Sequence, residues 1–248
     1  MIKPIRPVVG ILLAVLMHSS FADNFTITTD DYDPYTIVSG QTVGGACAEL
    51  IETALKLEGH TVSFIPVPWA RATAMAASGE VAGTMPWFKT PEREAQYAFS
   101  APVIEAKNVI FFKKGGKFDR KLNWHRYEDL KPYRMGGVIG YWYESGFKKA
   151  GVSAELVRKD DQNIQKLDTG RIDGFITDEL VGKRIIATRF PGREKEFDIV
   201  EKPESIQPLF VMGKKGAPQT EKLIEHLNAG LRKLHASGQY ARIVAKYK

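Results

Sequence analysis

The sequence predicts an α/β fold of two lobes. Segments with strand character alternate with segments of helical periodicity from residue 25 to the end of the chain, and this alternation is typical of parallel sheets covered by helices. The length of 248 residues suits one large domain or two modest ones. Two stretches rich in Lys, Gly or Pro, near 113–117 and 201–208, are the expected crossings between the lobes.

The first half of the chain is predicted to contain four strands and two helices. Apolar residues recur at helical spacing at Ala48, Ile51 and Leu55, and Gly59 follows the end of this helix. The second helix starts at Pro68 and is closed by Gly79. The expected strands are 25–28, 61–67, 81–85 and 109–112, and the expected helices are 44–57 and 68–77.

The second half continues the alternation and ends in a long helical region that Gly238 interrupts. The expected strands are 134–139, 155–157, 173–177 and 210–212, and the expected helices are 145–149, 163–169, 179–187 and 220–247.

Composition and charge favour a compact globular protein without a nucleic-acid partner. Apolar residues make up 44% and charged residues 26%, which excludes collagen-like and disordered classes. The net charge of +6 is small, and the basic residues alternate with acidic ones along the chain. We therefore expect no nucleic-acid-binding stripe.

The first 22 residues have the three zones of a secretory signal peptide. Lys3 and Arg6 precede an apolar run at 8–17, and Ser20 and Ala22 place small residues before the predicted cleavage. The run is too short to span the roughly 30 Å of hydrocarbon in a bilayer. The alternative is a buried N-terminal helix. We predict cleavage near Ala22 and export to the periplasm.

The one cysteine, Cys47, lies in an apolar stretch with helical periodicity. A single cysteine cannot form an internal disulfide, so the exported fold depends on its core. Its surroundings favour a buried, inert thiol over a nucleophile.

Sequence motifs give no positive sign of an enzyme, a metal or an organic cofactor. The chain has no HExxH, CxxC or GxSxG motif and no phosphate-binding loop. The histidines after the leader are scattered along the sequence, so no metal site is predicted from them.

Three stretches in a fixed order carry a family resemblance. They are Thr90-Pro91-Glu92-Arg93 followed by Phe99-Ser100-Ala101-Pro102, the stretch GRIDGFITDE at 170–179, and the ending from Leu231 to Tyr247. Together they resemble the bacterial extracellular solute-binding proteins, family 3, of polar amino-acid ABC importers. The resemblance covers residues 24–248.

The resemblance implies the two-lobed periplasmic-binding-protein fold of type II, in which each lobe is a mostly parallel sheet flanked by helices. Hinge closure would trap a small ligand between the lobes, which then dock on an ABC permease in the inner membrane. We expect residues 23–113 plus 209–248 in lobe 1, 114–208 in lobe 2, and a monomer.

The resemblance also assigns two charged ligand contacts. Arg93 corresponds to the residue that holds the α-carboxylate of the ligand, and a guanidinium suits this role because it donates two parallel hydrogen bonds. Asp178 corresponds to the residue that holds the α-ammonium. The structural alternatives are a solvated arginine for Arg93 and a helix N-cap for Asp178, and the two roles of Asp178 are compatible.

Aromatic residues replace small polar ones at several positions of the family pattern. Tyr32 matches the aromatic that the family places over the ligand side chain, and Thr90 opens the T-x-x-R motif. Bulky rings at expected pocket positions predict a narrow, aromatic pocket, with Arg71 as a second candidate anion contact. The rings concerned are Trp69, Trp87, Phe88, Tyr141, Trp142 and Tyr143, of which one or two are expected to be core packing.

The resulting hypothesis is a periplasmic protein that binds a small zwitterion, an amino acid in the first place, and is not an enzyme. One alternative is a dehydratase acting on prephenate-like acids on the same fold, with Glu144 or Glu179 as its general acid. A second alternative is a sensory protein that reports its ligand to a membrane receptor.

Overall fold

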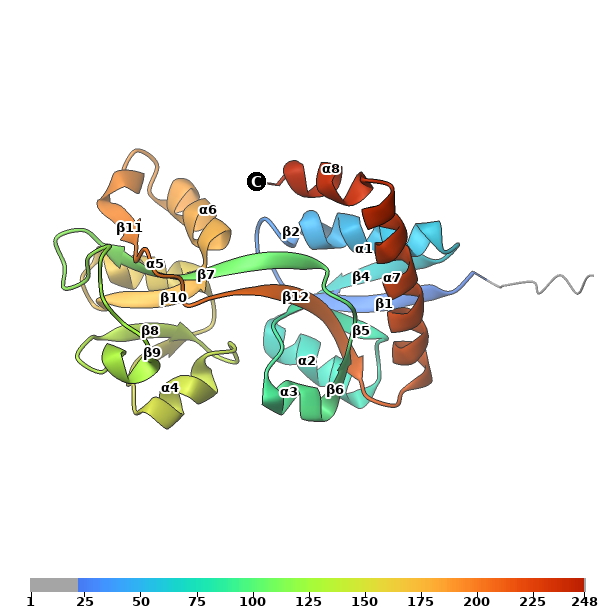
Figure 1. Ribbon diagram of the computed structural model, residues 1–248, viewed down its shortest axis with the longest axis horizontal. Coiled ribbons are helices and arrows are strands. Elements are labelled where there is room, and N and C mark those ends of the chain that lie inside the picture. Colours follow the sequence, from blue (N-terminus) through green and yellow to red (C-terminus); the bar gives the residue numbers. More distant parts are fainter. Residues whose placement is uncertain (1–21, 248) are drawn as a thin grey trace, which may run out of the picture.

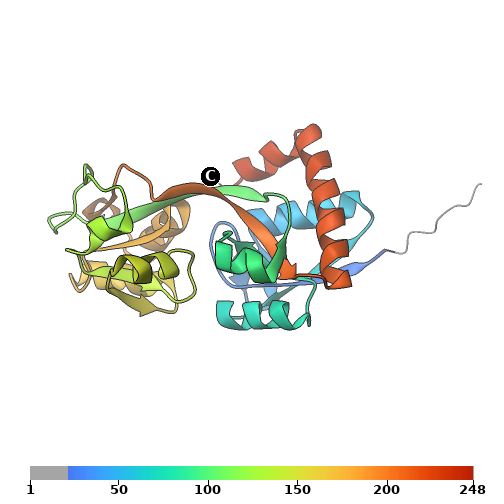
Figure 2. The same ribbon diagram turned by 60° about the horizontal axis from the view of Figure 1, so that its bottom comes forward.

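The computed structural model describes residues 22–247, and the predicted signal peptide lies almost wholly outside them. The described chain forms two lobes joined along one edge, as Figures 1 and 2 show. Within this range, no helix is both long and apolar enough to cross a membrane.

Lobe 1 is built on three parallel strands and one antiparallel strand. β4 (Thr61–Pro66), β1 (Asn24–Thr29) and β5 (Gly83–Trp87) run parallel, and β12 (Ser205–Lys214) pairs antiparallel with β5. The remaining elements are β2 (Ile37–Ser39), β3 (Thr42–Gly44), α1 (Ala46–Leu57), α2 (Trp69–Ser78), α3 (Pro91–Gln96), β6 (Tyr97–Phe99), α7 (Pro218–Ala236) and α8 (Gln239–Ala245).

Lobe 2 repeats this plan. β10 (Gly174–Asp178), β8 (Met135–Val138) and β9 (Ala154–Val157) run parallel, and β7 (Ile104–Lys113) pairs antiparallel with β10. The other elements are a short 3-10 helix (Tyr127–Leu130), α4 (Glu144–Ala150), α5 (Asp160–Asp168), α6 (Glu179–Arg189), a second 3-10 helix (Glu194–Glu196) and β11 (Phe197–Ile199).

The two lobes share one continuous sheet because β7 and β12 pass from one to the other. These strands pair antiparallel, with Ile104–Asn108 opposite Ser205–Leu209. One of the expected crossings, 201–208, overlaps this pair. The other, 113–117, is wrong: Lys113 ends β7 and the following residues form a turn beside β11. The physical reason is that strand pairing, and not a flexible linker, carries the chain between the lobes.

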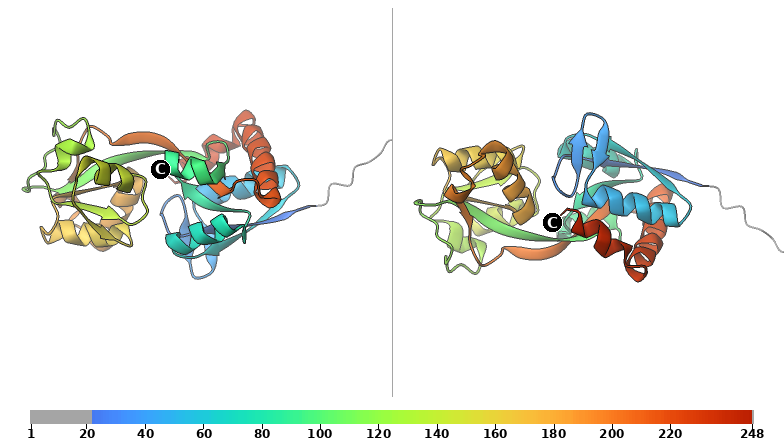
Figure 3. Two further views of the ribbon diagram at one scale, coloured as in Figure 1. Left: turned by 90° about the horizontal axis from the view of Figure 1, so that it is seen from below. Right: turned by 90° about the horizontal axis from the view of Figure 1, so that it is seen from above.

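Helix packing explains the positions of α1, α7 and α8 on one side of lobe 1 (Figure 3). α7 buries Leu223, Leu227, Leu231 and Leu234 in the lobe 1 core, where Cys47 of α1 is also buried. Cys47 is buried, as predicted, and burial raises the pKa of its thiol.

Several expected boundaries move in the structure. β5 starts at Gly83 and includes Pro86, which was expected to follow the strand. The register of its partner strand β12 shifts between Phe210 and Met212, and a sheet tolerates a residue without an N–H at such an irregularity. The short strands β2, β3, β6 and β11 were not expected, since three residues carry almost no periodic signal.

Candidate functional site

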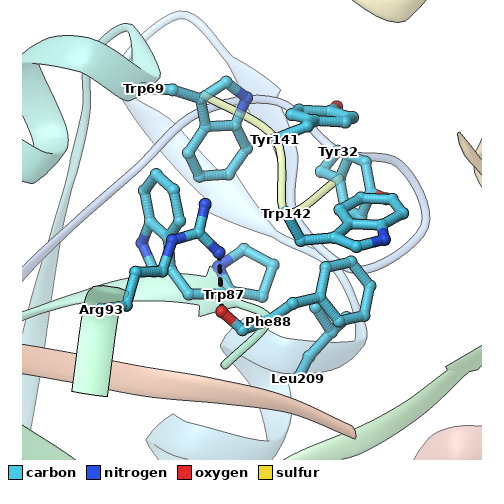
Figure 4. Close-up of a pocket in the computed structure, with 9 residues that line it drawn as sticks. Tyr32, Trp69, Trp87, Phe88, Arg93, Tyr141, Trp142 and Leu209 are labelled. Carbon is cyan, nitrogen blue, oxygen red and sulfur yellow. Dashed lines mark hydrogen bonds between the residues drawn. The ribbon is translucent and has the colours of Figure 1, made fainter. Parts of the chain in front are cut away.

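The cleft between the lobes contains a narrow aromatic cavity, with about 300 Å³ of empty space when the open solvent at its mouth is included. It lies where the strands of both lobes end, the edge at which α/β sheets bind ligands. Figure 4 shows the side chains that surround it. They are Tyr32, Trp69, Pro86, Trp87, Phe88, Arg93, Tyr141, Trp142 and Leu209.

The rings of this cavity come from both lobes and contact each other across it. Trp69, the first residue of α2, meets Trp87 of β5 edge-on with 5.1 Å between the ring centroids. Phe88 of lobe 1 meets Trp142 of lobe 2 at 4.4 Å. Tyr32, in the turn after β1, faces Tyr141 at 6.4 Å. The lobes therefore meet in a cage of aromatic rings.

Arg93 is the charged group of this cavity. Its guanidinium carbon lies 4.7 Å from the centroid of the Trp87 ring, and two of its nitrogens donate to the carbonyl oxygens of Phe88 at 2.6 Å and Gly140 at 2.7 Å. Burial lowers the pKa of Arg93 to about 10. This value is still well above 7, so the guanidinium stays charged at neutral pH. Among residues 22–247, no carboxylate oxygen lies within 4.0 Å of this guanidinium.

Thr90 supports Arg93 from outside the cavity. Its side chain caps α3 by accepting a hydrogen bond from the backbone N–H of Arg93 at 3.2 Å. It does not line the aromatic cavity. Arg71 does not line it either, because it points to solvent from α2.

Asp178 is placed behind the cavity wall and has all its bonds within the protein. One oxygen caps α6 by accepting from the N–H groups of Leu180 and Val181, at 2.8 and 3.2 Å. The other accepts from the Tyr35 hydroxyl and the Lys107 N–H, each at 3.0 Å. The side chain is fully buried. In the structure Asp178 therefore caps α6 and, through Tyr35, forms a hydrogen bond between the lobes. It does not lie with Arg93 in the aromatic cavity.

A second compartment of the cleft, with about 1100 Å³ of empty space including open solvent, is lined by charges of both signs, the cations being Lys159, Arg184 and Arg189. Tyr32, Trp69 and Tyr141 line both compartments, so the two compartments meet at these rings. Four carboxylates line the second compartment: Asp31, Asp33, Asp160 and Asp161.

Asp160 differs from the other three carboxylates because it is buried and has no cationic partner in the part of the chain that the structure describes. Asp33 pairs with Arg184 at 3.6 Å and Asp161 with Arg189 at 2.7 Å, whereas Asp31 is exposed. Burial raises the pKa of Asp160 to about 6, against the effect of a hydrogen bond from the Tyr141 hydroxyl.

Three buried oxygens at this point of the cleft are left without a hydrogen-bond partner among the described residues. They are Oδ1 of Asp160 and the hydroxyls of Tyr32 and Thr177. An unpaired buried polar atom costs free energy, roughly 1–3 kcal/mol. The ionised carboxylate of Asp160 can only accept a hydrogen bond, so a cationic ligand group placed here would satisfy it, as would a bond donated by either hydroxyl.

Sequence reasoning missed Asp160. An aspartate in the first turn of a helix is usually a surface residue that interacts with the helix dipole. Asp160 is distinguished from the adjacent Asp161 only by its burial against Tyr141, which lies 19 positions earlier in the sequence. Leu209 was likewise not among the expected site residues, whereas Trp142, one of the aromatic residues behind the predicted pocket, does line the cavity.

The fold and the cleft define a class: a two-lobed protein that encloses a small molecule between lobes joined by a pair of strands. The family model of the bacterial extracellular solute-binding proteins, family 3, matches residues 26–248. The chain belongs to this family.

Individual relatives are distant in sequence but similar over most of their length. A probable histidine-binding protein of Neisseria gonorrhoeae is 24% identical over 83% of this chain and 75% of its own. The structure of an ancestral arginine-binding protein bound to arginine is 26% identical, with a TM-score of 0.75 over 90% of this chain and 97% of that one. A histidine kinase sensor domain similar to periplasmic binding proteins has a TM-score of 0.77 at 22% identity, covering 90% of this chain and 95% of that one.

Proposed function

We propose that this protein is a periplasmic binding protein that captures an amino acid in the cleft and delivers it to an ABC permease. The observation that carries the proposal is a pair of unmatched charges in the cleft. Within residues 22–247, Arg93 is a partly buried cation without a carboxylate partner, and Asp160 is a buried carboxylate without a cationic partner. A zwitterion supplies both missing groups in one molecule.

The arrangement gives each charged group a role. A guanidinium has five N–H donors, and two atoms of Arg93 are engaged with carbonyl oxygens, so donors remain for a ligand carboxylate. Tyr32, Trp69 and Tyr141 stack around the ligand's middle portion. Asp160 receives its ammonium or a cationic side chain. Relatives that bind histidine and arginine support a cationic amino acid as the first ligand to test.

Hydrogen bonds between the two lobes stabilise the closed form of the cleft. Glu92 of lobe 1 accepts from Ser145 of lobe 2 at 3.1 Å, and Tyr35 of lobe 1 donates to Asp178. A ligand favours the closed form only by the difference in its affinity for the two forms. Because Arg93 and Asp160 lie in different lobes, a ligand that bridges them gains both contacts only on closure.

The experiment is calorimetric titration of ligand-stripped protein with the twenty L-amino acids, the decarboxylated amine of each ligand that binds, and its carboxamide. We expect binding of at least one amino acid and loss of binding for its amine and amide forms. Equal binding of an amine that has no carboxylate would contradict a carboxylate site at Arg93.

One observation favours a second candidate, the dehydratase. Asp160 is a carboxyl group in the cleft that takes up a proton near pH 6, as a general acid must. Glu144 and Glu179, the expected candidates, do not line the aromatic cavity: Glu144 accepts from the Gly140 N–H, and Glu179 pairs with Lys107 at 2.9 Å. Turnover of prephenate that Asp160→Asn abolishes would replace the binding-protein proposal by this one.

The sensory alternative differs from transport in its partner and not in its cleft. Co-purification of the ligand-loaded protein with a permease complex supports transport. Co-purification with a receptor ectodomain instead would favour sensing.

A further inference from the structure

Two histidines and an aspartate that are far apart in the sequence meet at one end of lobe 1. Asp23 directly precedes β1, His60 directly precedes β4, and His226 lies on α7. β1 and β4 pair in parallel with Asn24 opposite Thr61, which brings Asp23 and His60 together. The cleft lies at the carboxyl ends of these strands, so the cluster lies at the opposite edge of the sheet, under α7 (Figure 1).

The geometry of this cluster suits one small ion. Each residue offers a ligand atom, and the three atoms all lie within 4.8 Å of one another. Zinc binds nitrogen and oxygen ligands at about 2.0–2.2 Å, so in its usual tetrahedral geometry two ligand atoms on one ion are about 3.3–3.6 Å apart. The ligand atoms of the cluster therefore have to approach one another by up to about 1.5 Å to close on a metal. The imidazoles of His60 and His226 already lie with their centroids 4.0 Å apart.

We propose that Asp23, His60 and His226 form a binding site for a divalent transition-metal ion, with zinc as the first candidate. Two imidazoles and one carboxylate are the donor set that zinc, nickel and copper prefer, whereas calcium and magnesium prefer oxygen alone. This site is independent of the amino-acid cleft. It would connect the start of β1 and the start of β4 to α7.

Packing alone is the competing explanation for the cluster. His60 is buried, with 4% of its surface exposed, and lies 5.7 Å from the ring of Phe25. Packing accounts for the two imidazoles beside an aromatic ring, since His226 also lies 6.3 Å from the ring of Phe25. It does not account for a carboxylate oxygen that lies within 4.8 Å of a ligand nitrogen of each imidazole.

The N-terminus that we predict for the exported protein would add a fourth donor. The backbone nitrogen of Asp23 lies 3.1 Å from Nδ1 of His60, to which it donates a hydrogen bond. Two nitrogens bound next to each other on one zinc ion are about 3.0–3.4 Å apart. Cleavage after Ala22 would turn this nitrogen into an α-amine, which can bind the ion together with the Asp23 carboxylate.

Lys222 competes with a metal for Asp23. Its ammonium lies 3.8 Å from the carboxylate, and its side chain is 61% exposed, so it can turn to solvent when an ion binds. Removing this positive charge by Lys222→Gln is expected to strengthen metal binding several-fold.

The test uses protein that is exported through its own leader, carries no affinity tag, and has been stripped of metal with a chelator. Its mass first establishes the N-terminal residue. Zinc chloride is then titrated against a chromophoric chelator, and thermal unfolding is followed with and without zinc. We expect one bound zinc per chain. At one hundred times its dissociation constant, zinc should raise the unfolding midpoint by about 5–10 °C.

The variants His226→Gln and Asp23→Asn each remove one ligand, and Asp23 lies outside the folded core. Each should weaken zinc binding by more than the roughly 10–100-fold that the loss of an outer-shell partner costs, because a residue that binds the ion directly is removed. His235→Gln is the matched control, because His235 is exposed on the same helix and lies outside the cluster. No saturable zinc binding by the wild type would overturn the proposal, as would unchanged affinity in both ligand variants. Amino-acid binding in the cleft is measured on the same samples, so failure of one site is distinguishable from failure of the other.

Discussion

Replacing Arg93 by alanine removes the cation of the aromatic cavity and is expected to abolish most ligand affinity. A hydrogen bond to a charged group contributes about 1.5–3 kcal/mol. Arg93 has donors left to make two such bonds with a ligand carboxylate, beyond those that it makes to Phe88 and Gly140. Losing two bonds at the lower limit costs about 3 kcal/mol, which corresponds to roughly 100-fold in the dissociation constant.

Two further variants make this experiment specific. Arg93→Lys keeps the charge but loses the planar fork, so we expect an intermediate loss of about 10-fold. Arg71→Ala is the matched control, because Arg71 is exposed on α2 and does not line the cavity. Calorimetric titration gives the affinities, and thermal unfolding without ligand shows whether each variant is folded.

The reasoning would be refuted if Arg93→Ala bound the ligand within about threefold of the wild type while remaining folded. It would also be refuted if Arg71→Ala lost the affinity instead. The latter result would mean that the anion site lies at the edge of the cleft, on α2.

Three other changes test the charge, the cap and the packing of the structure. Because burial raises the pKa of Asp160 to about 6, affinity of the wild type for a cationic ligand should fall as the pH drops below 6. Asp160→Asn should bind the ligand weakly at every pH and be at least as stable as the wild type at pH 7, because it buries no charge. If Asp160→Asn shows the same pH dependence of affinity as the wild type, Asp160 does not have this role. Asp178→Ala leaves the Tyr35 hydroxyl and the first turn of α6 without an acceptor, so urea unfolding should show a loss of about 2 kcal/mol or more in the free energy of unfolding. Unchanged stability together with lost ligand binding would instead support the ligand contact expected from the family. Gly230→Ala would put a methyl group into the backbone of Ala54 where α7 crosses α1, so we expect a lower unfolding midpoint, and an unchanged midpoint would mean that the helices can separate at no cost.

The family and the fold class could be predicted from the sequence because they depend on local patterns in order. The alternation of strands and helices needs only neighbouring residues, and the T-x-x-R and G-R-x-D motifs lie within short stretches. The match of the family model over residues 26–248 confirms that prediction. The aromatic pocket could also be expected, since most of its rings lie in turns beside recognisable motifs.

The role of a charged residue could not be predicted in the same way. Asp178 and Asp160 are both aspartates at the start of a helix, and the sequence pattern favours the first as the ligand contact. In the folded chain the hydroxyl of Tyr35 and the N–H of Lys107 satisfy Asp178, whereas one oxygen of Asp160 has no partner in the described structure. These partners come from distant segments, so no local window contains them.

The sequence by itself therefore determined the family, the order of the longer strands and helices, and the arginine of the cavity. Each of these depends on patterns within short, contiguous stretches of residues. Only the tertiary structure decided which carboxylate is left unsatisfied in the cleft, and that His60 and His226 meet beside Asp23. The physical reason is that burial and pairing are properties of contacts between segments. Those contacts exist only after β1, β4 and α7, or the two lobes, have come together.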